Sequence, residues 1–571
     1  MKKDEWFYDY PQLNNLKEIV YNSVEKYAEI NAFVLKEKNG EETSYKYITY
    51  KEFLNQVNNL GTGLFNLGMK GKRIAVISKN RYEWVWGYIS TLLGDMIAVP
   101  LDKGLQEAEI ESCLIRSKAD AVIFEDSFSE LMKNLKASGK TNLKEYICMD
   151  KSSEFKNIYD IAKEGEKILA KGNKDYINTE INSEDMRMIL FTSGTTSMSK
   201  AVMLSHKNVA TNVSSVVRVG KVNPGDSNLA FLPFHHTMGS TGLMFVFAQG
   251  ACTAFPDGLR YVAQNLKEYK VAVFIGVPLL IESIYKKMMK EIQKQGKEKL
   301  INTARKVTNG LLKLKIDIRR KVFKQVIDQL GGELRFVING AAAIDKEVAK
   351  GFNELGIRLI QGYGLTETSP ILSVENDKYL KYGSSGFPVT NVQVKIADED
   401  EFGVGEIIAS GPSIMLGYYE NEEATNDVLK NGWFYTGDLG YIDEEGYVFV
   451  TGRKKNVIVL KNGKNIYPEE LEALVNKLEV VKDSMVYGAQ KADDVMVSVK
   501  VQYDEEIVKE KYPNKTKEEL VKIVWDQIKE INKTLPTYKY IKNMVLTGEE
   551  FIKTTTAKIK RYEEIKKMQT N

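Results

Sequence analysis

The sequence predicts an α/β protein, with a large N-terminal domain of wound parallel sheets, a β-rich subdomain, and a small α+β domain at the C-terminal end. Two observations support this class. Short apolar runs rich in β-branched residues alternate with amphipathic helical patterns over most of the chain, which is typical of βαβ units. At 571 residues, the chain also exceeds what one hydrophobic core organises, so we expect two or more domains.

The composition is that of an ordinary globular protein, with 43% hydrophobic and 27% charged residues. The 80 Lys and Arg nearly balance the 77 Asp and Glu, so no global charge points to nucleic acid. Cys113, Cys148 and Cys252 lack the spacing of a zinc site or redox motif, and we expect buried thiols in a reducing compartment. The chain shows neither a signal-peptide core nor an apolar run of membrane length, which predicts a soluble cytoplasmic protein.

The first wound region consists of alternating helical and strand-like patterns. The expected helices are residues 48–68, 82–93 and 107–116, and the expected strands are residues 73–78, 96–101 and 119–124. A polar, lysine-rich interval then leads to the apolar strand 186–191.

A loop rich in Ser and Thr follows this strand, at residues 191–200, with the sequence Phe-Thr-Ser-Gly-Thr-Thr-Ser-Met-Ser-Lys. Hydroxyls, backbone N–H groups, the permissive Gly194 and the charge of Lys200 would suit a polyphosphate. The common P-loop pattern does not fit this loop. Taken alone, the loop is better explained as a plain connection between two elements.

Two of the three histidines, His235 and His236, stand in the segment 228–239. A histidine beside apolar residues is usually a satisfied core group. Adjacent side chains point in different directions, so we expect no joint metal site here.

Residues 282–330 contain fourteen Lys and Arg against five Asp and Glu, a local net charge of +9. Apolar residues recur here at helical spacing: Ile284, Met288, Ile292, Leu311, Leu314, Ile318 and Val322. The pattern indicates either a solvated helical excursion or a surface that meets anionic lipid.

Strands are expected at residues 334–338 and 357–361, and polar turns follow both of them. The second turn, residues 362–370, reads Gly-Tyr-Gly-Leu-Thr-Glu-Thr-Ser-Pro. Open α/β sheets bind ligands at the carboxyl ends of strands, and Glu367 is a plausible Mg²⁺ ligand there.

From Gln393 the pattern becomes β-rich, and Asp438 ends one of its strands beside Gly437. Residues 452–456 are the best boundary candidate, which predicts domains 1–453 and 454–571. The C-terminal part should contain a helix started by Pro468, paired strands at 480–487 and 495–503, and a helix capped by Thr516 and Glu519.

Five motifs in fixed order, at residues 191–200, 362–370, 435–438, 452–455 and 553–561, resemble those of the AMP-forming acyl-CoA synthetases in the adenylate-forming ligase superfamily. The resemblance extends from Ile48 to Arg561. It implies that a carboxylate attacks the α-phosphate of Mg·ATP to give acyl-AMP and pyrophosphate, and that a thiol, usually that of coenzyme A, then displaces AMP.

The resemblance also implies roles for single residues. The β- and γ-phosphates would be covered by Thr192, Ser193, Gly194, Thr195, Thr196 and Lys200. Thr366 would contact the α-phosphate, and Glu367 would hold Mg²⁺. Adenine would be flanked by Gly340, Ala341, Ala342 and Tyr363, and the ribose would be contacted by Asp438 and Arg453. Lys455 is at the hinge of the small mobile domain, Gly463 borders the CoA path, and His236 controls access of the acyl group. Lys558 matches the lysine of adenylation.

Four positions depart from the family pattern. Ser197, Ala201 and Ala557 replace the usual Gly, and Ser199 replaces the usual Pro. These changes restrict backbone conformation and leave open a non-catalytic nucleotide-binding relative. A ligase for carrier-protein thiols and a luciferase-type oxygenase are further alternatives.

The basic segment 282–330 and the amino-acid sequences of residues 339–344 and 362–370 resemble those of the family members that act on long-chain fatty acids. Medium-chain or aryl acids are the alternative substrates. If the substrate is a long-chain acid, we expect the cytoplasmic protein also to contact the inner face of the membrane, and residues 282–330 would make this contact.

Overall fold

The computed structural model describes residues 8–40, 42–151, 154–192, 199–461, 464–491, 494–554 and 558–570. Contacts divide the chain into two compact units. Unit 1 contains Met1–Gln393 and Ala409–Phe434, and unit 2 contains Val394–Ile408 and Tyr435–Asn571. The β-rich residues before position 453 thus fall largely with the C-terminal residues. These units are groups of residues in contact, and they do not test the predicted domain boundary between residues 453 and 454, which stays a prediction.

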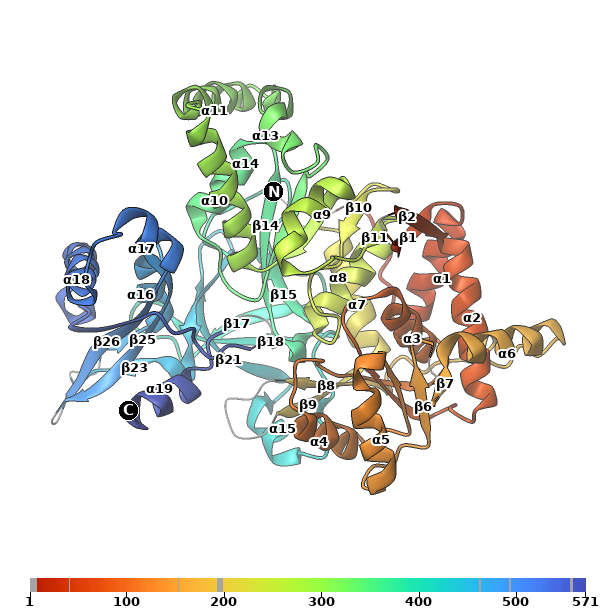
Figure 1. Cartoon of the computed structure of the whole chain (residues 1–571). Coiled ribbons are helices and arrows are strands. Elements are labelled where there is room, and N and C mark those ends of the chain that lie inside the picture. The colour runs from red at the N-terminus through yellow and green to blue at the C-terminus, as the bar shows by residue number, and fades with distance from the viewer. Residues whose placement is uncertain are drawn as a thin grey trace. The chain divides into compact units, whose positions relative to one another are not determined.

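Unit 1 is built on two large sheets (Figure 1). The first has eight strands in the order β19-β9-β8-β4-β3-β5-β6-β7, and the strands from β8 to β7 are parallel. Its strands are β3 (Arg73–Ile77), β4 (Ile97–Pro100), β5 (Ala121–Phe124), β6 (Glu145–Cys148), β7 (Lys156–Asn157), β8 (Met186–Thr192), β9 (Lys200–Ser205) and β19 (Gly417–Tyr418). The antiparallel edge, β9 and β19, follows the Ser/Thr loop.

The second sheet has nine strands in the order β16-β15-β14-β13-β12-β10-β11-β1-β2, with a parallel centre and antiparallel edges. Its strands are β1 (Asn31–Asn39), β2 (Glu42–Thr49), β10 (Ser227–Leu229), β11 (Cys252–Ala254), β12 (Val271–Gly276), β13 (Phe336–Asn339), β14 (Arg358–Gly364), β15 (Ile371–Val374) and β16 (Phe387–Pro388). The predicted α/β class with parallel sheets is confirmed.

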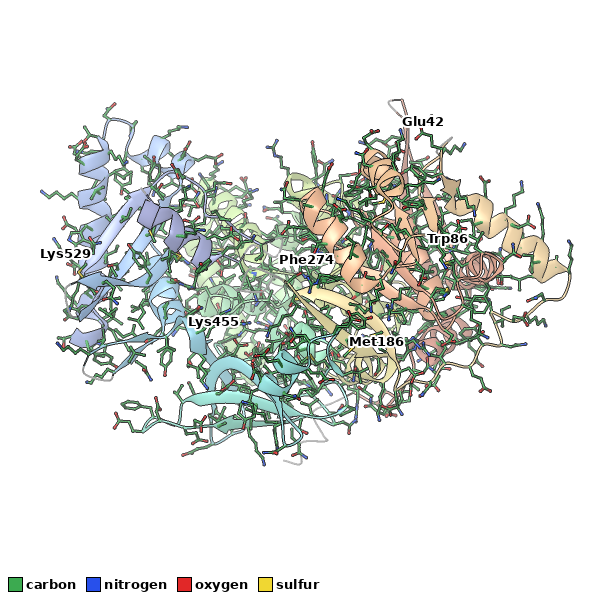
Figure 2. All side chains as sticks on the ribbon, turned by 90° about the horizontal axis from the view of Figure 1, so that it is seen from below. Glu42, Trp86, Met186, Phe274, Lys455 and Lys529 are labelled. Atoms are coloured by element: carbon green, nitrogen blue, oxygen red, sulfur yellow. The ribbon has the colours of Figure 1, made fainter. Side chains whose placement is uncertain are left out.

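Helices cover both faces of these sheets, as the alternation of side chains requires. On β12, Val273 and Ile275 join the largest core, whereas Phe274, labelled in Figure 2, packs into a second core on the other face. The helices of unit 1 are α1 (Leu16–Tyr27), α2 (Tyr50–Asn66), α3 (Tyr82–Leu92), α4 (Glu107–Ser117), α5 (Ser129–Ser138), α6 (Ile158–Ala170), α7 (His206–Val217), α8 (Thr237–Phe247), α9 (Val262–Glu268), α14 (Lys346–Glu354) and α15 (Glu422–Val428). All three cysteines are buried and unpaired, as expected.

The basic segment forms α10 (Pro278–Lys294), α11 (Glu298–Lys313), α12 (Arg319–Val322) and α13 (Lys324–Asp328), drawn in green in Figure 1. Ile284, Met288 and Ile292 are buried in the second core, which confirms their predicted helical face. Leu314 and Val322 are exposed, so the second half of the predicted apolar pattern does not mark a core face. Among the described residues, none of the helices combines the length and apolar composition that a bilayer crossing requires.

Unit 2 contains most of a five-stranded sheet, formed by β17 (Gln393–Ala397), β18 (Gly405–Ser410), β20 (Leu429–Lys430), β21 (Trp433–Ile442) and β22 (Val448–Arg453). It continues with β23 (Ile458–Val459), β24 (Asn465–Ile466), β25 (Val481–Lys491), β26 (Asp494–Tyr503), β27 (Asn543–Thr547), α16 (Pro468–Val475), α17 (Glu505–Lys511), α18 (Lys517–Lys533) and α19 (Arg561–Thr570). The predicted strand pair β25–β26, the proline at the start of α16 and the capping box of Thr516 and Glu519 are all confirmed.

Glu375, directly after β15, is a buried acid whose ionisation should make unit 1 less stable at high pH. Burial raises its pKa to about 8, against the lowering effect of the backbone N–H groups of Lys381 and Gln361 and the charge of Arg358. Because the folded-state pKa lies above the ordinary value of 4.5, the folded protein holds this proton over the interval between them. The stability from this group is therefore complete below pH 4.5 and is lost as the pH rises through 8.

We expect Glu375→Gln to flatten the pH dependence of stability by about 1 kcal/mol per pH unit between pH 6 and 8. Urea midpoints of the wild type and the variant, measured across this range, check the difference of slopes. The glutamine also loses one of the two N–H contacts, so its midpoint at pH 6 should be lower than that of the wild type. Equal slopes for both proteins would contradict the assignment of the proton to Glu375.

Candidate active site

The Ser/Thr loop connects two paired strands of unit 1. Thr192 at the end of β8 is opposite Lys200 at the start of β9, and the Thr192 hydroxyl donates to the Lys200 carbonyl at 3.3 Å. This pairing fixes both ends of the loop. The predicted phosphate-binding residues Ser193, Gly194, Thr195 and Thr196 lie outside the described residues, as does Ser197.

Two of the four departures from the family pattern, one just before β9 and one within it, are accommodated by regular contacts. Ser199 accepts hydrogen bonds from Arg116 at its carbonyl, at 2.7 Å, and at its hydroxyl, at 3.2 Å. Ala201 is buried in β9, opposite Phe191, and its carbonyl accepts from the Tyr419 N–H at 2.8 Å. The methyl group of Ala201 therefore occupies a regular strand position and imposes no left-handed backbone. Ala557 lies outside the described residues.

A second part of the candidate site lies at the carboxyl ends of β13 and β14, which are parallel neighbours. Gly340, Ala341 and Ala342 follow β13, and the side-chain amide of Asn339 donates to the Ala342 carbonyl at 2.9 Å. Tyr363 lies near the end of β14. Thr366 and Glu367 open a short 3-10 helix, η4 (Thr366–Thr368), directly after that strand. The two predicted turns thus meet at one edge of the sheet, as the strand pattern indicated.

Tyr418 links the lysine and the glutamate of the candidate site. Its hydroxyl donates to Oε1 of Glu367 at 2.9 Å, and the Lys200 ammonium lies 4.5 Å from the centre of its ring. Strand β19 pairs with β9 and so holds Tyr418 beside Val202, while the Met415 N–H donates to the Glu367 carbonyl at 2.8 Å. Sequence reasoning gave Tyr418 no role.

The structure corrects the expectation for the adjacent histidines. The ring centres of His235 and His236 are only 4.2 Å apart, tilted by 48°, because the chain turns between them as His236 becomes the N-cap of α8. Asp102, just after β4, approaches the same pair, with Oδ2 3.4 Å from Nε2 of His235. One ligating atom from each of these three residues lies within 4.8 Å of the others.

In unit 2, the predicted ribose residues form an ion pair across two strands. Asp438 on β21 is opposite Arg453 on β22, and the Arg453 Nε lies 2.6 Å from the Asp438 carboxylate. Asp438 is buried, whereas Lys455, labelled in Figure 2, is exposed in the 3-10 helix η5 (Lys454–Asn456). Gly463 lies outside the described residues.

Lys558 stands near the end of a narrow loop in unit 2. Lys553 and Ile559 form an isolated antiparallel bridge, and the Thr554 N–H donates to the Lys558 carbonyl at 2.8 Å. The residue as a whole is exposed, yet desolvation of its ammonium lowers the Lys558 pKa; the charge of Arg453 lowers it further, and Asp438 raises it. The lysine thus shares an electrostatic environment with the predicted ribose residues.

Two ion pairs hold the base of this loop. Glu564, fully buried on α19, accepts from the Lys500 ammonium and from the Ile552 N–H, both at 2.7 Å. Arg561 donates to both carboxylate oxygens of Glu472, at 2.7 and 2.5 Å. A buried carboxylate requires a cation or N–H donor as its partner. The contacts of Glu564 and Glu472 therefore fix Ile552 and Arg561, the residues on either side of the loop. Sequence reasoning predicted none of these contacts.

In unit 1, a fixed cation and a fixed carboxylate lie beside strand ends, which is the arrangement expected for a metal-bound polyphosphate. The carboxylate of Glu367 fits one ligand of Mg²⁺, since Mg²⁺ usually takes one or two carboxylates and completes its shell with phosphate oxygens and water. In unit 2, Asp438 can accept from sugar hydroxyls, and Lys558 offers a second cation.

Comparison with known proteins agrees with this geometry. The family of AMP-binding enzymes matches residues 20–419, and the C-terminal domain of AMP-binding enzymes matches residues 455–570. Fatty acyl-CoA synthetase B of Dictyostelium discoideum is 29% identical over 84% of this chain and 76% of its own length. Long-chain-fatty-acid–CoA ligase 5 of Rattus norvegicus is 28% identical over 92% of this chain and 84% of its own. The structure of the anthranilate CoA ligase AuaEII with anthranoyl-AMP covers 99% of both chains, with a TM-score of 0.76 and 20% identity.

Proposed function

Because this chain belongs to the family of AMP-binding enzymes, we propose that it activates a long-chain fatty acid with ATP. The acid would form an acyl-adenylate with release of pyrophosphate, and the thiol of coenzyme A would then displace AMP to give the acyl-CoA thioester. The observation that carries the proposal is the Lys200–Tyr418–Glu367 arrangement at the foot of the Ser/Thr loop. A cation and a carboxylate beside the same tyrosine support the proposal, because a metal-bound triphosphate requires both kinds of charge.

The first step joins two anions, and the proposed roles follow from that. Lys200 neutralises the departing β- and γ-phosphates, and Thr366 donates to the α-phosphate. Lys558 offsets the repulsion between the incoming carboxylate and the α-phosphate. When bound, Mg²⁺ on Glu367 would neutralise phosphate charge that develops in the transition state. Asp438 holds the ribose hydroxyls, and its pairing with Arg453 orients the carboxylate.

Fatty acids are the substrate class in the names of the Dictyostelium and rat relatives. Medium-chain acids, aryl acids and a carrier-protein thiol are the alternatives within the same chemistry. A purely nucleotide-binding role is less well supported, because the described charged positions at the candidate site are all present. Of the described departures, Ala201 fits a regular strand and Ser199 accepts hydrogen bonds from Arg116.

Pyrophosphate release with acids from acetate to palmitate, with and without coenzyme A, tests the proposal. We expect turnover that rises with chain length, requires coenzyme A for the thioester, and yields AMP. ATP binding without pyrophosphate release from any acid would contradict the proposed activity. Turnover only with short or aromatic acids would contradict the substrate class alone.

We also propose that α11 brings the enzyme to anionic membranes, where long-chain acids partition. Leu300, Val307 and Leu314 recur every seven residues and are 66%, 57% and 69% exposed. Each of these apolar residues directly follows an exposed lysine, namely Lys299, Lys306 or Lys313, so a row of basic side chains runs beside the row of apolar side chains. This pairing is typical of helices that lie at a lipid surface.

On the other face of the same helix, Ile301 and Thr308 are buried, and Arg305 and Asn309 bind Glu354 of α14 at 2.7 and 2.9 Å. The helix is therefore anchored while its apolar line remains exposed.

Changing Lys299, Lys306 and Lys313 to Gln should weaken vesicle binding by about 3 kcal/mol, on the order of a hundredfold, at low salt. Co-sedimentation with vesicles of neutral and anionic lipid measures the effect, which should shrink as salt rises. The matched control changes the exposed Lys522, Lys529 and Lys533 of α18 to Gln and should bind like the wild type. Binding that is indifferent to anionic lipid would remove the membrane proposal and leave the ligase proposal intact.

A further inference from the structure

We propose that Asp102, His235 and His236 form a binding site for a divalent transition-metal ion of the zinc class, separate from the Mg²⁺ at Glu367. Within the described residues, one ligating atom from each of the three lies within 4.8 Å of the other two. The Oδ2 of Asp102 and the Nε2 of His235 are 3.4 Å apart. Two ligands around a tetrahedral zinc ion, with bonds of about 2.1 Å, are separated by about 3.4 Å. One edge of the coordination polyhedron is therefore already formed.

The Nε2 atom of His235 indicates that the site is built for a ligand. The side chain is more than nine-tenths buried, yet this nitrogen has no hydrogen-bond partner among the residues that the structure describes. The Asp102 carboxylate lies 3.4 Å from this nitrogen but forms no hydrogen bond with it. A buried polar atom without a partner costs about 1–3 kcal/mol, and a metal ion at this position would recover that cost.

The backbone around the cluster is held in place. The side-chain amide of Asn80 donates to the carbonyls of Ala230 and Leu232 at 2.8 and 2.7 Å, and its oxygen accepts from the Phe234 N–H at 3.1 Å. These three contacts present His235 at the end of a fixed segment. On the other side, Oδ1 of Asp102 accepts from the Gly104 N–H at 2.8 Å, which orients Oδ2 toward the histidine.

The ligand types select the metal class. Two imidazoles and one carboxylate suit Zn²⁺, Co²⁺ and related ions, whereas Mg²⁺ prefers an all-oxygen shell. Three protein ligands leave one coordination position for water or for a carboxylate from solution. The consequence for catalysis relies on the proposed function: a metal ion would fix His236, which we expect to control access of the acyl group. Occupancy should therefore inhibit acid activation.

Co²⁺ is the probe, because four-coordinate Co²⁺ has visible absorption bands much stronger than those of the octahedral aqueous ion. Titration of the full-length chain with Co²⁺ should give these bands at one equivalent, and Zn²⁺ should displace them. Asp102→Asn and His235→Gln should each weaken binding on the order of a hundredfold or more. The control Asp126→Asn changes an exposed carboxylate outside the cluster and should bind Co²⁺ like the wild type.

Absence of the bands in the wild type, or bands that persist equally in Asp102→Asn and His235→Gln, would overturn the proposal, whether or not the variants retain full stability. A charge-transfer band from a cysteine thiolate would also overturn it, since the cluster contains no sulfur. Inhibition of pyrophosphate release by Zn²⁺ at excess Mg²⁺, reduced in Asp102→Asn, tests the consequence separately. If no acid is activated at all, the proposed function fails while the absorption experiment still decides the metal site.

Discussion

Lys558→Ala should lose adenylation by orders of magnitude and yet still convert supplied acyl-AMP and coenzyme A to the thioester. An ammonium that bridges the incoming carboxylate and an α-phosphate oxygen acts only while two like charges are forced together, so its loss affects the first half-reaction. The loop that carries Lys558 is fixed at its base by Glu564 and Arg561, whose contacts do not involve the lysine side chain. The variant should therefore fold normally. Pyrophosphate release and thioester formation, measured separately, check the two halves.

Lys560→Ala is the charge-matched control. Lys560 is two residues further along the chain, and its ammonium pairs with Glu563 at 3.0 Å. We expect the control to retain both half-reactions within a few-fold of the wild type. Equal impairment of both variants in both halves would falsify the specific role of Lys558 and leave a general effect of positive surface charge.

The local patterns in the sequence predicted most of the fold. Strands β3, β4 and β5 and helices α2, α3 and α4 follow from apolar runs and helical spacing, and the starts of α16 and α18 follow from single residues. The pattern was misleading at the end of α11, where Leu314, the C-cap, continues a helical repeat but is exposed. Periodicity states which residues share a face and cannot state whether that face meets a core, water or lipid.

The candidate site was predictable only in part, because its motifs are local and its contacts are not. Glu367 and Lys200 stand in recognisable motifs, whereas Tyr418, which joins them, is 51 residues from Glu367 in sequence. The approach of Asp102 to His235, and that of Glu564 to Lys500, likewise depend on how distant strands and helices pack. Such pairs leave no spacing signal in a single sequence.

Glu367→Gln should lower adenylation by about a hundredfold or more and raise the Mg²⁺ concentration required for half-maximal rate. The glutamine oxygen can still accept from the Tyr418 hydroxyl, and the Met415 N–H still reaches the backbone carbonyl, so the turn should keep its structure. What the variant loses is the negative charge that would hold the ion. Initial rates of pyrophosphate release across a Mg²⁺ titration, together with the thermal unfolding midpoint, separate the loss of a metal ligand from the loss of the fold.

Tyr418→Phe is the control that removes the same hydrogen bond and leaves the carboxylate. If the metal role of Glu367 is correct, this variant should keep the Mg²⁺ dependence of the wild type and lose only the alignment that the hydroxyl provides, a several-fold effect on rate. Its ring still lies beside Lys200, so the position of that ammonium should change little. A Mg²⁺ dependence that shifts equally in both variants would mean that the hydrogen bond, and not the charge of Glu367, controls the ion. Unchanged acyl-AMP formation in Glu367→Gln would refute the metal role outright.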